Sequence, residues 1–133
     1  MDIREKALYW HKKGYNCAQV VLAACSELTG LDEKTAFAIS GGFGGGLRSG
    51  EVCGAISGAV MAVGMAYPFT DGSDAESKQK IAELAKQCVA AAEEKYGKIR
   101  CSELKGSIDC NEIICFMAET AEKMIREKIQ VRR

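Results

Sequence analysis

The feature that most limits the fold of this chain is a helical spacing of apolar residues that recurs along most of its length. Ile81, Leu84, Cys88 and Ala92, for example, follow one another at intervals of three or four positions, which places them on one face of a helix. No run shows the strict alternation of apolar and polar residues that is typical of a half-buried strand. The pattern therefore predicts an all-α protein.

Side chains that can cap helix starts, and glycines that can end helices, divide this pattern into a bundle of about five to six helices. Asn16 and Asp32 can each accept a hydrogen bond from the first turn of a helix, and Gly30 can end one. Further start signals are Ser49 and two pairs with capping-box spacing, Ser73 with Glu76 and Asp109 with Glu112. The predicted helices cover residues 2–13, 17–30, 32–40, about 50–66, 74–96 and 110 onward, and the tail QVRR is expected to fray.

The size and charge of the chain predict one domain without a basic or acidic binding face. A length of 133 residues with 47% hydrophobic residues suffices for one core, so residues 1–133 are expected to form a single domain. Eighteen basic and eighteen acidic residues cancel, so we expect no nucleic-acid partner. The start MDIREKALYW lacks the apolar run of a secretory signal. The longest uncharged run, Val52–Thr70, is rich in small residues, so we expect a cytoplasmic protein without membrane insertion.

Eight of the eighteen residues in GGFGGGLRSGEVCGAISG, residues 41–58, are glycine. A phosphate-binding loop is not indicated, because no lysine and hydroxyl pair follows the glycines and no strand precedes them. Glycine lets the backbone approach a bulky group closely and leaves its N–H free to point at sulfur. The glycines that we expect to serve a cofactor or thiolate in this way are Gly44, Gly45, Gly46 and Gly54.

A second use of glycine is indicated in the helix that follows. Gly54 and Gly58 are four residues apart and share their helix with Ala55, Ala59 and Ala62. Such a face of small residues allows another helix to approach closely, either within the bundle or across a homodimer interface.

Seven cysteines are many for a protein expected in a reducing compartment, where disulfides are disfavoured. Metal binding or redox chemistry is the natural expectation. Three of them, Cys25, Cys88 and Cys115, fall within predicted helices among apolar residues, where cysteine packs as a small hydrophobic side chain. The other four lie next to predicted helix or turn starts: Cys17, Cys53, Cys101 and Cys110.

A cysteine at a helix start lies near free backbone N–H groups and the positive end of the helix dipole. Both favour the thiolate, which is the form that binds metal or reacts. Four such thiols are the number that a tetrathiolate metal site needs. Positive charge nearby in the sequence would also favour thiolates, and it comes from Arg48, Lys98, Arg100 and Lys105.

The spacing of these cysteines by itself predicts no metal or redox site. There is no C-x-x-C, so neither a zinc knuckle nor a thioredoxin-like pair is indicated. The separations are 36, 48 and 9 residues, and the fold must bring the thiols together. The alternative is that four cysteines merely happen to fall near helix ends.

The order of motifs along the chain resembles that of a known family, the redox-active proteins named for their C_GCAxxG_C_C cysteine pattern. The similar segments are NCAQVVLAA, the SGGFGGG run, the signature CGAISG, then YGKIRC and a last cysteine that opens the C-terminal helix. The resemblance implies that the family's four cysteines correspond to Cys17, Cys53, Cys101 and Cys110. Cys115 competes with Cys110 for the fourth place, and we prefer Cys110 because the apolar positions after it match the family.

The resemblance also implies a cofactor. A similar domain occurs in split-Soret cytochromes, where four cysteines are associated with an iron–sulfur cluster, so a [2Fe–2S]-type centre is the leading hypothesis. The protein would then carry electrons for a redox partner protein whose identity the sequence does not give.

Three alternatives stay open at this point. The first is a redox or sensor protein that cycles between a dithiol and a disulfide, with Cys101 and Cys110 as the nearest pair in sequence and Cys53 in the most accessible-looking loop. The second is a structural zinc site, because zinc also binds four thiolates. The third is a helical interaction module whose cysteines only pack and bind no metal.

Conventional catalysis has little support, so whether the protein is an enzyme stays open. His11 is the one histidine, and its place in the first helix favours a structural role. Ser57 lies in GAISG, which has the wrong spacing for a nucleophile elbow.

Overall fold

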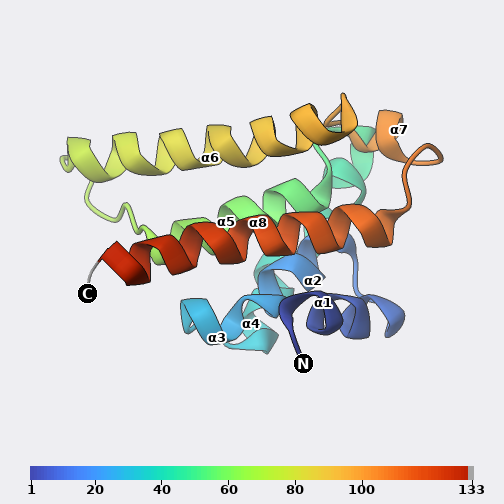
Figure 1. Ribbon diagram of the computed structural model, residues 1–133, viewed down its shortest axis with the longest axis horizontal. Helices are drawn as coiled ribbons and strands as arrows, with labels where there is room; N and C mark the ends of the chain where they lie inside the picture. Colours follow the sequence, from blue (N-terminus) through green and yellow to red (C-terminus); the bar gives the residue numbers. More distant parts are fainter. Residues whose placement is uncertain (132–133) are drawn as a thin grey trace.

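The computed structural model describes the backbone of residues 1–131 and the side chains of residues 1–128, and within this range the protein is all-α, as predicted. Figure 1 shows the helices in chain order. They are α1 (Ile3–Lys12), α2 (Cys17–Ala24), α3 (Ser26–Thr29), α4 (Glu33–Ser40), α5 (Gly54–Ala66), α6 (Ala75–Tyr96), α7 (Cys101–Leu104) and α8 (Cys110–Val131). A 3₁₀ turn, η1 (Gly41–Phe43), and a wide turn, η2 (Gly46–Gly50), lie between α4 and α5.

The three longest helices lie along the length of the molecule, with α6 on one side of α5 and α8 (Figure 1). Helices α1, α3 and α4 lie on the opposite side, and α2 lies between them and α5. The starts of α5 and α8 and the whole of α7 are at one end of the molecule, on the right in Figure 1. Segments that are far apart in the sequence therefore meet at this end.

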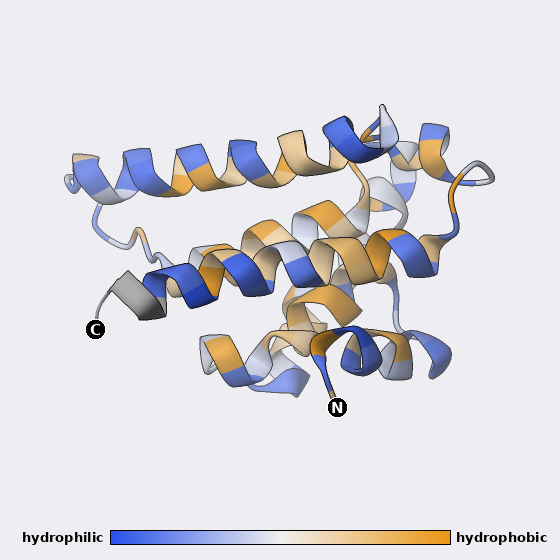
Figure 2. Ribbon diagram, viewed as in Figure 1, coloured by the Kyte–Doolittle hydropathy of each residue, from blue (hydrophilic) through white to orange (hydrophobic). Residues whose placement is uncertain are grey.

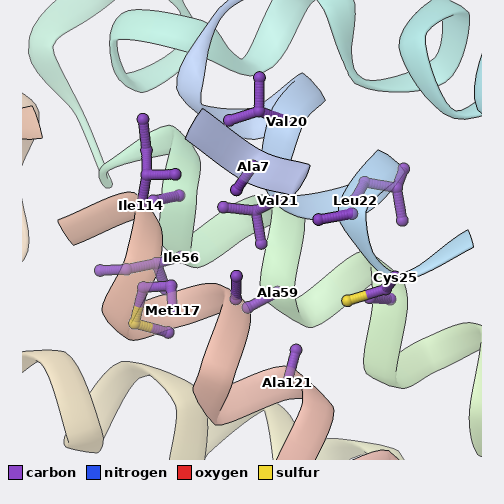
Figure 3. Close-up of a cluster of buried hydrophobic side chains, with 14 of the residues drawn as sticks. Ala7, Val20, Val21, Leu22, Cys25, Ile56, Ala59, Ile114, Met117 and Ala121 are labelled. Carbon is purple, nitrogen blue, oxygen red and sulfur yellow. The ribbon is translucent and has the colours of Figure 1, made fainter. Parts of the chain in front are cut away.

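The core forms where α2 packs against α5 and α8, as Figure 3 shows. Helix α2 is buried on every side, with Val20, Val21 and Leu22 exposed by 1% or less. One face of α8 is buried through Ile113, Ile114, Met117, Ala118 and Ala121. Helix α6 has one apolar stripe, which faces the other helices in Figure 2, and its buried residues are Leu84, Cys88 and Ala92. The predicted face of this helix is therefore confirmed at Leu84, Cys88 and Ala92, whereas Ile81 is only partly buried.

Two predicted helix boundaries are wrong at the starts of α5 and α6. Ser49 does not cap α5, because its hydroxyl donates to the carbonyl oxygen of Leu47 (3.1 Å) and α5 begins only at Gly54. Asp74, rather than Ser73, caps α6 and accepts a hydrogen bond from the N–H of Ser77 at 3.0 Å. At α6 two neighbouring polar residues, Ser73 and Asp74, could each cap the helix, whereas α5 begins without any side-chain cap.

The predicted helix 17–30 is also interrupted, at Cys25. The N–H of Cys25 donates to the carbonyl of Leu22 and its own carbonyl accepts from Leu28, which turns the chain from α2 into α3. Gly30 ends α3 with a φ of 78°, as expected. The short helices α3 and α7 make the described helices more numerous than the five to six predicted.

The small-residue face of α5 is used inside the bundle. A Cβ placed on Gly58 would lie 2.6 Å from the carbonyl oxygen of Ala18 in α2, and Ala55, Ala59 and Ala62 are fully buried. The face therefore brings α5 close to α2, and the expectation of a homodimer stays a prediction.

Two further findings concern the expectations about membranes and the tail. Within the described residues, none of the helices combines the length and the apolar composition that crossing a bilayer requires. Helix α8 continues to Val131. The prediction that the tail QVRR frays falls in part on Arg132 and Arg133, which lie outside the described residues.

Candidate thiolate site

The four cysteines predicted at helix starts line one cavity at the end of the molecule where α2, α5, α7 and α8 begin. Its volume is about 30 Å³. The other lining residues are Ala55, Leu104, Lys105, Ile108 and Ile113, so the walls between the sulfurs are mainly apolar. Cys17 is the first residue of α2, Cys53 precedes α5, and Cys101 and Cys110 begin α7 and α8.

The three remaining cysteines lie elsewhere, in the core. Cys25 and Cys88 are fully buried and Cys115 is 4% exposed. Burial raises the pKa of Cys25 to about 12 and that of Cys88 to about 11, which keeps both as thiols. Cys115 does not line the cavity, and its neighbour from α1 is Arg4. Of the two candidates for the fourth place, the structure therefore brings Cys110 to the other three.

The start of α2, which carries Cys17, is fixed by a reciprocal cap. Asn16 Oδ1 accepts from the N–H of Gln19, and Gln19 Oε1 accepts from the N–H of Asn16, both at 3.0 Å. Asn16 Nδ2 also donates to the carbonyl of Gly41 at 3.0 Å. The same side chain therefore begins the helix and attaches it to the glycine-rich segment. Gly44 permits this contact, because a Cβ there would lie 2.5 Å from Asn16 Cγ.

Cys53 and Cys101 are held by a short antiparallel pairing of their backbones. The N–H of Cys53 donates to the carbonyl of Ile99 (2.8 Å), and the N–H of Cys101 donates to the carbonyl of Glu51 (2.7 Å). Val52 and Arg100 face one another between these bonds as an isolated bridge. The sequence analysis missed this pairing because a bridge of one residue pair leaves no alternating pattern.

Cys17 and Cys53 meet because residue 54 has no side chain. A Cβ on Gly54 would lie 2.6 Å from Cys17 Sγ and 2.9 Å from the carbonyl oxygen of Phe43. Gly54 thus leaves the space that the thiol of Cys17 needs beside the start of α5.

A left-handed turn carries the backbone past Cys17. Gly45, Gly46, Leu47 and Arg48 have φ values of 65°, 64°, 62° and 58°, a conformation that costs leucine and arginine about 1–2 kcal/mol each. The turn directs the N–H of Gly45 at the sulfur of Cys17. Gly46 has a different role, because a Cβ there would lie 2.3 Å from the carbonyl oxygen of Glu51. Of the four glycines expected near a cofactor, Gly45 and Gly54 therefore adjoin a site sulfur directly.

The surroundings of Cys17 favour its thiolate. Its pKa is lowered to about 6, first because the Cys53 thiol can donate a hydrogen bond to the sulfur. The backbone N–H groups of Gly45, Ala18 and Cys17 itself lower the pKa further, and burial opposes them. The same pairing raises the pKa of Cys53, and burial raises it further, although the N–H groups of Ala55 and Ile56 act the other way. The pairing therefore favours one thiolate and one thiol over two thiolates in this part of the site.

Cys110 forms the solvent-exposed edge of the cavity. Its pKa is raised by partial burial first and then by the nearby groups of Cys17, Cys101 and Asp109. Lys105 opposes this shift with its positive charge, and it is the one cationic side chain that lines the cavity. Positive charge from Lys105 thus compensates part of the repulsion among the four sulfurs.

The donor set fits a thiolate-bound metal centre, but the sulfurs are not yet arranged around one point. Within residues 1–128, no group of three or more His, Cys, Asp or Glu side chains is close enough to hold a metal ion. Binding would therefore require the four thiols to draw together. The exposed position of Cys110 and the loop that carries Lys105 and Ile108 leave this edge of the cavity accessible to solvent.

The candidates for acid–base catalysis lie in other surroundings. His11 Nδ1 lies 2.7 Å from Asn111 Oδ1, a contact that joins the end of α1 to the start of α8. Ser57 lies in the first turns of α5 and is half-buried, and neither residue lines the cavity.

Comparison with known protein families finds a match over most of the chain. The sequence model of the family described as "Putative redox-active protein (C_GCAxxG_C_C)" matches residues 15–124, which include all four cavity cysteines. Comparisons with curated proteins and with solved structures gave no significant match.

Proposed function

The chain belongs to the C_GCAxxG_C_C family of redox-active proteins, and on that premise we propose that Cys17, Cys53, Cys101 and Cys110 bind an iron–sulfur cluster for electron transfer. The observation that supports this proposal most directly is that four thiols from four separate segments line one largely apolar cavity. A site that worked only as a dithiol would need two of them. Four thiolates are the usual ligand set of a [2Fe–2S] cluster.

Each part of the site has a role in this proposal. The N–H of Gly45 donates to the sulfur of Cys17, and the start of α5 presents N–H groups to Cys53; such bonds stabilise thiolates. Leu104 and Ile108 form apolar walls beside the sulfurs, while Lys105 offsets their negative charge. A bound cluster would supply a one-electron carrier. Because electron transfer of this kind needs no general acid or base, the absence of His11 from the cavity is compatible with it.

Anaerobic purification followed by reconstitution with ferrous iron and sulfide tests the proposal. We expect visible absorption and about two iron and two sulfide per chain. Serine at any of the four cavity cysteines should lower the iron content, whereas Cys25→Ala should leave it unchanged. Colourless protein without iron after reconstitution would contradict the proposal. Protein that takes up zinc but no iron would indicate a structural site, since zinc has no redox chemistry.

The contact between Cys17 and Cys53 supports a second candidate function, a dithiol that cycles to a disulfide. The sequence suggested Cys101 and Cys110 as the nearest pair, but in the structure the thiol of Cys53 is the one placed to stabilise a Cys17 thiolate. All seven cysteines are free thiols here. Mass spectrometry after mild oxidation with oxidised glutathione should show a Cys17–Cys53 bridge if this function holds, and a random mixture of bridges would reject it.

A further inference from the structure

Two consecutive residues in the turn before α5 keep a strained backbone that no contact inside the fold explains. Leu47 and Arg48 have φ values of 62° and 58°, a conformation that glycine adopts freely. Glycine occupies positions 44–46 and 50 of the same segment, but not these two. The side chain of Leu47 is 54% exposed, and that of Arg48 is also exposed. Strained backbone is typical of functional segments, so both side chains are candidates for contact with another molecule.

The strained turn lies against the segments that carry two of the cavity cysteines. A Cβ on Gly50 would lie 3.0 Å from the Cβ of Ser102, the residue that follows Cys101. Val52 is two residues beyond Gly50 and directly precedes Cys53. The exposed side chains of the turn are therefore at the end of the molecule where the thiols meet.

The backbone pairing of residues 51–53 with 99–101 has an outer face that turns away from the sulfurs. Val52 and Arg100 face one another across the bridge, and both are exposed, Val52 by 37%. Successive side chains of an extended segment point to opposite faces, and the next residues, Cys53 and Cys101, line the cavity. One layer of backbone therefore separates Val52 and Arg100 from two of the site cysteines.

The arginines at this end of the molecule are the ones without an ion pair. Arg4 and Arg126 each lie beside a glutamate of α8, at 3.7 and 3.1 Å. Arg48 and Arg100 have no carboxylate partner among the residues whose side chains the structure describes. A guanidinium can bind a carboxylate through two parallel hydrogen bonds. These two arginines are thus available to carboxylates of another molecule.

The neighbouring charges favour a protein over a membrane as that molecule. Residues 47–53 and 98–109 contain the cations Arg48, Lys98, Arg100 and Lys105 and the carboxylates Glu51, Glu103 and Asp109. The carboxylates cancel most of the positive charge, whereas an anionic bilayer attracts clusters of about four to eight Lys and Arg. A protein surface can instead match single charges and cover the exposed apolar side chains of Leu47 and Val52.

Four exposed side chains make up the outer face: Leu47, Arg48, Val52 and Arg100. We propose that the outer face is the docking surface of the redox partner, a protein that carries carboxylates around an apolar spot beside its own redox centre. The inference rests on the proposed function, because one electron would pass from the reduced centre of one protein to the oxidised centre of the other. Complexes of this kind have small interfaces, below about 1,200 Å², whose formation is steered by charge.

Binding of an acidic plant-type ferredoxin to the metal-free protein tests the docking surface without a cluster. At about 0.1 M salt, charges more than about 10 Å away are largely screened. Under these conditions we expect calorimetry to show about tenfold weaker binding for Arg48→Gln and for Arg100→Gln. Arg126→Gln is the matched control, because it removes the same charge from an arginine that already has an ion pair, and its affinity should not change.

An apolar variant separates docking from stability. Leu47→Gly should weaken ferredoxin binding, while its melting temperature stays the same or rises because glycine relieves the strain at this φ. Met65→Ala is the matched control, since Met65 is 43% exposed near the other end of α5. This change should leave ferredoxin binding as it is in the wild type.

Electron exchange in reconstituted protein provides the third measurement. The two arginine variants should exchange electrons with the ferredoxin about tenfold more slowly than the wild type. Their exchange with a small uncharged quinone should not change, because a small molecule needs no docking surface.

The outcomes separate the docking surface from the iron–sulfur proposal. Wild-type protein that does not bind the ferredoxin, or arginine variants that bind it normally, would overturn the inference. Tighter binding to basic cytochrome c or to phosphatidylserine vesicles than to the ferredoxin would also overturn it. Ferredoxin binding that depends on Arg48 and Arg100, in a protein that takes up no cluster, would support the docking surface and contradict the iron–sulfur proposal.

Discussion

The sulfur of Cys17 occupies the space that a side chain at residue 54 would need. A Cβ on Gly54 would lie only 2.6 Å from Cys17 Sγ, a separation that real Cβ atoms essentially never show. The signature CGAISG therefore has a structural reason for the glycine after its cysteine: Gly54 admits a thiol from α2 next to the thiol of Cys53.

Replacing this glycine should disturb the site and the fold together. Gly54→Ala is expected to lower the free energy of unfolding by about 1–3 kcal/mol, because the added carbon overpacks against Cys17 and the Phe43 carbonyl. Gly64→Ala is the matched control in the same helix, since its Cβ would meet only Ile81 at 4.0 Å. That change should stabilise the protein by up to about 1 kcal/mol through helix propensity. Urea denaturation measures the free energy of unfolding of both variants. Equal changes in the two variants would contradict the steric argument.

The left-handed turn predicts a stabilising substitution beside the site. Arg48 is exposed and has a φ of 58°, so Arg48→Gly should relieve strain and raise the free energy of unfolding by about 0.5–1 kcal/mol. Ser49→Gly, one residue further along and outside the left-handed region, should lower it by a similar amount because glycine only adds freedom to the unfolded chain. Thermal denaturation of the two variants checks the prediction, and a lower stability of Arg48→Gly would contradict it.

The contact between Cys17 and Cys53 predicts a pH dependence of the metal-free protein. The pKa of Cys17 is lowered from 9.0 to about 6, so its thiolate contributes stability that is present above pH 9 and is lost as the pH falls through 6. Thiolate absorption should accordingly show one group titrating near pH 6. Cys53→Ala should move that midpoint upward because it removes the leading hydrogen-bond donor, while Cys53→Ser retains a donor and should move it less. An unchanged midpoint in Cys53→Ala would contradict this account.

The cavity also predicts which of two neighbouring cysteines in α8 serves a metal centre. Cys110→Ser should reduce iron uptake on reconstitution, because Cys110 lines the cavity. Cys115→Ala should leave iron uptake unchanged and lower the free energy of unfolding by on the order of 1 kcal/mol, because Cys115 is a core residue with 4% exposure. Iron analysis and chemical denaturation of both variants measure these effects. The opposite pattern of iron loss would assign the fourth place to Cys115.

The family to which the chain belongs was evident in the sequence, and so was the division of its cysteines. Cys25, Cys88 and Cys115 were expected in the core and are buried there. The prediction for these three cysteines succeeded because apolar residues that recur at the helical period form the buried face of a helix. The set of Cys17, Cys53, Cys101 and Cys110 was likewise identifiable, because a helix start is marked by residues within a few positions of it.

The sequence by itself determined the features that depend on local contacts: the all-α class, the apolar faces, the cap at Asn16 and the glycine stop at Gly30. Each of these rests on hydrogen bonds or side-chain spacing within about four residues, so the local sequence contains the necessary information. The boundary that failed most clearly, at Ser49, failed because the left-handed turn and the backbone pairing of residues 51–53 with 99–101 intervene.

Only the tertiary structure decided that the four thiols share a cavity and that Cys17 lies against Gly54. These relationships join segments 36 and 48 residues apart. They are set by how α2 packs on α5 and how α6 and α7 return to the start of α5, and such packing depends on the shapes of whole helix faces rather than on any short pattern.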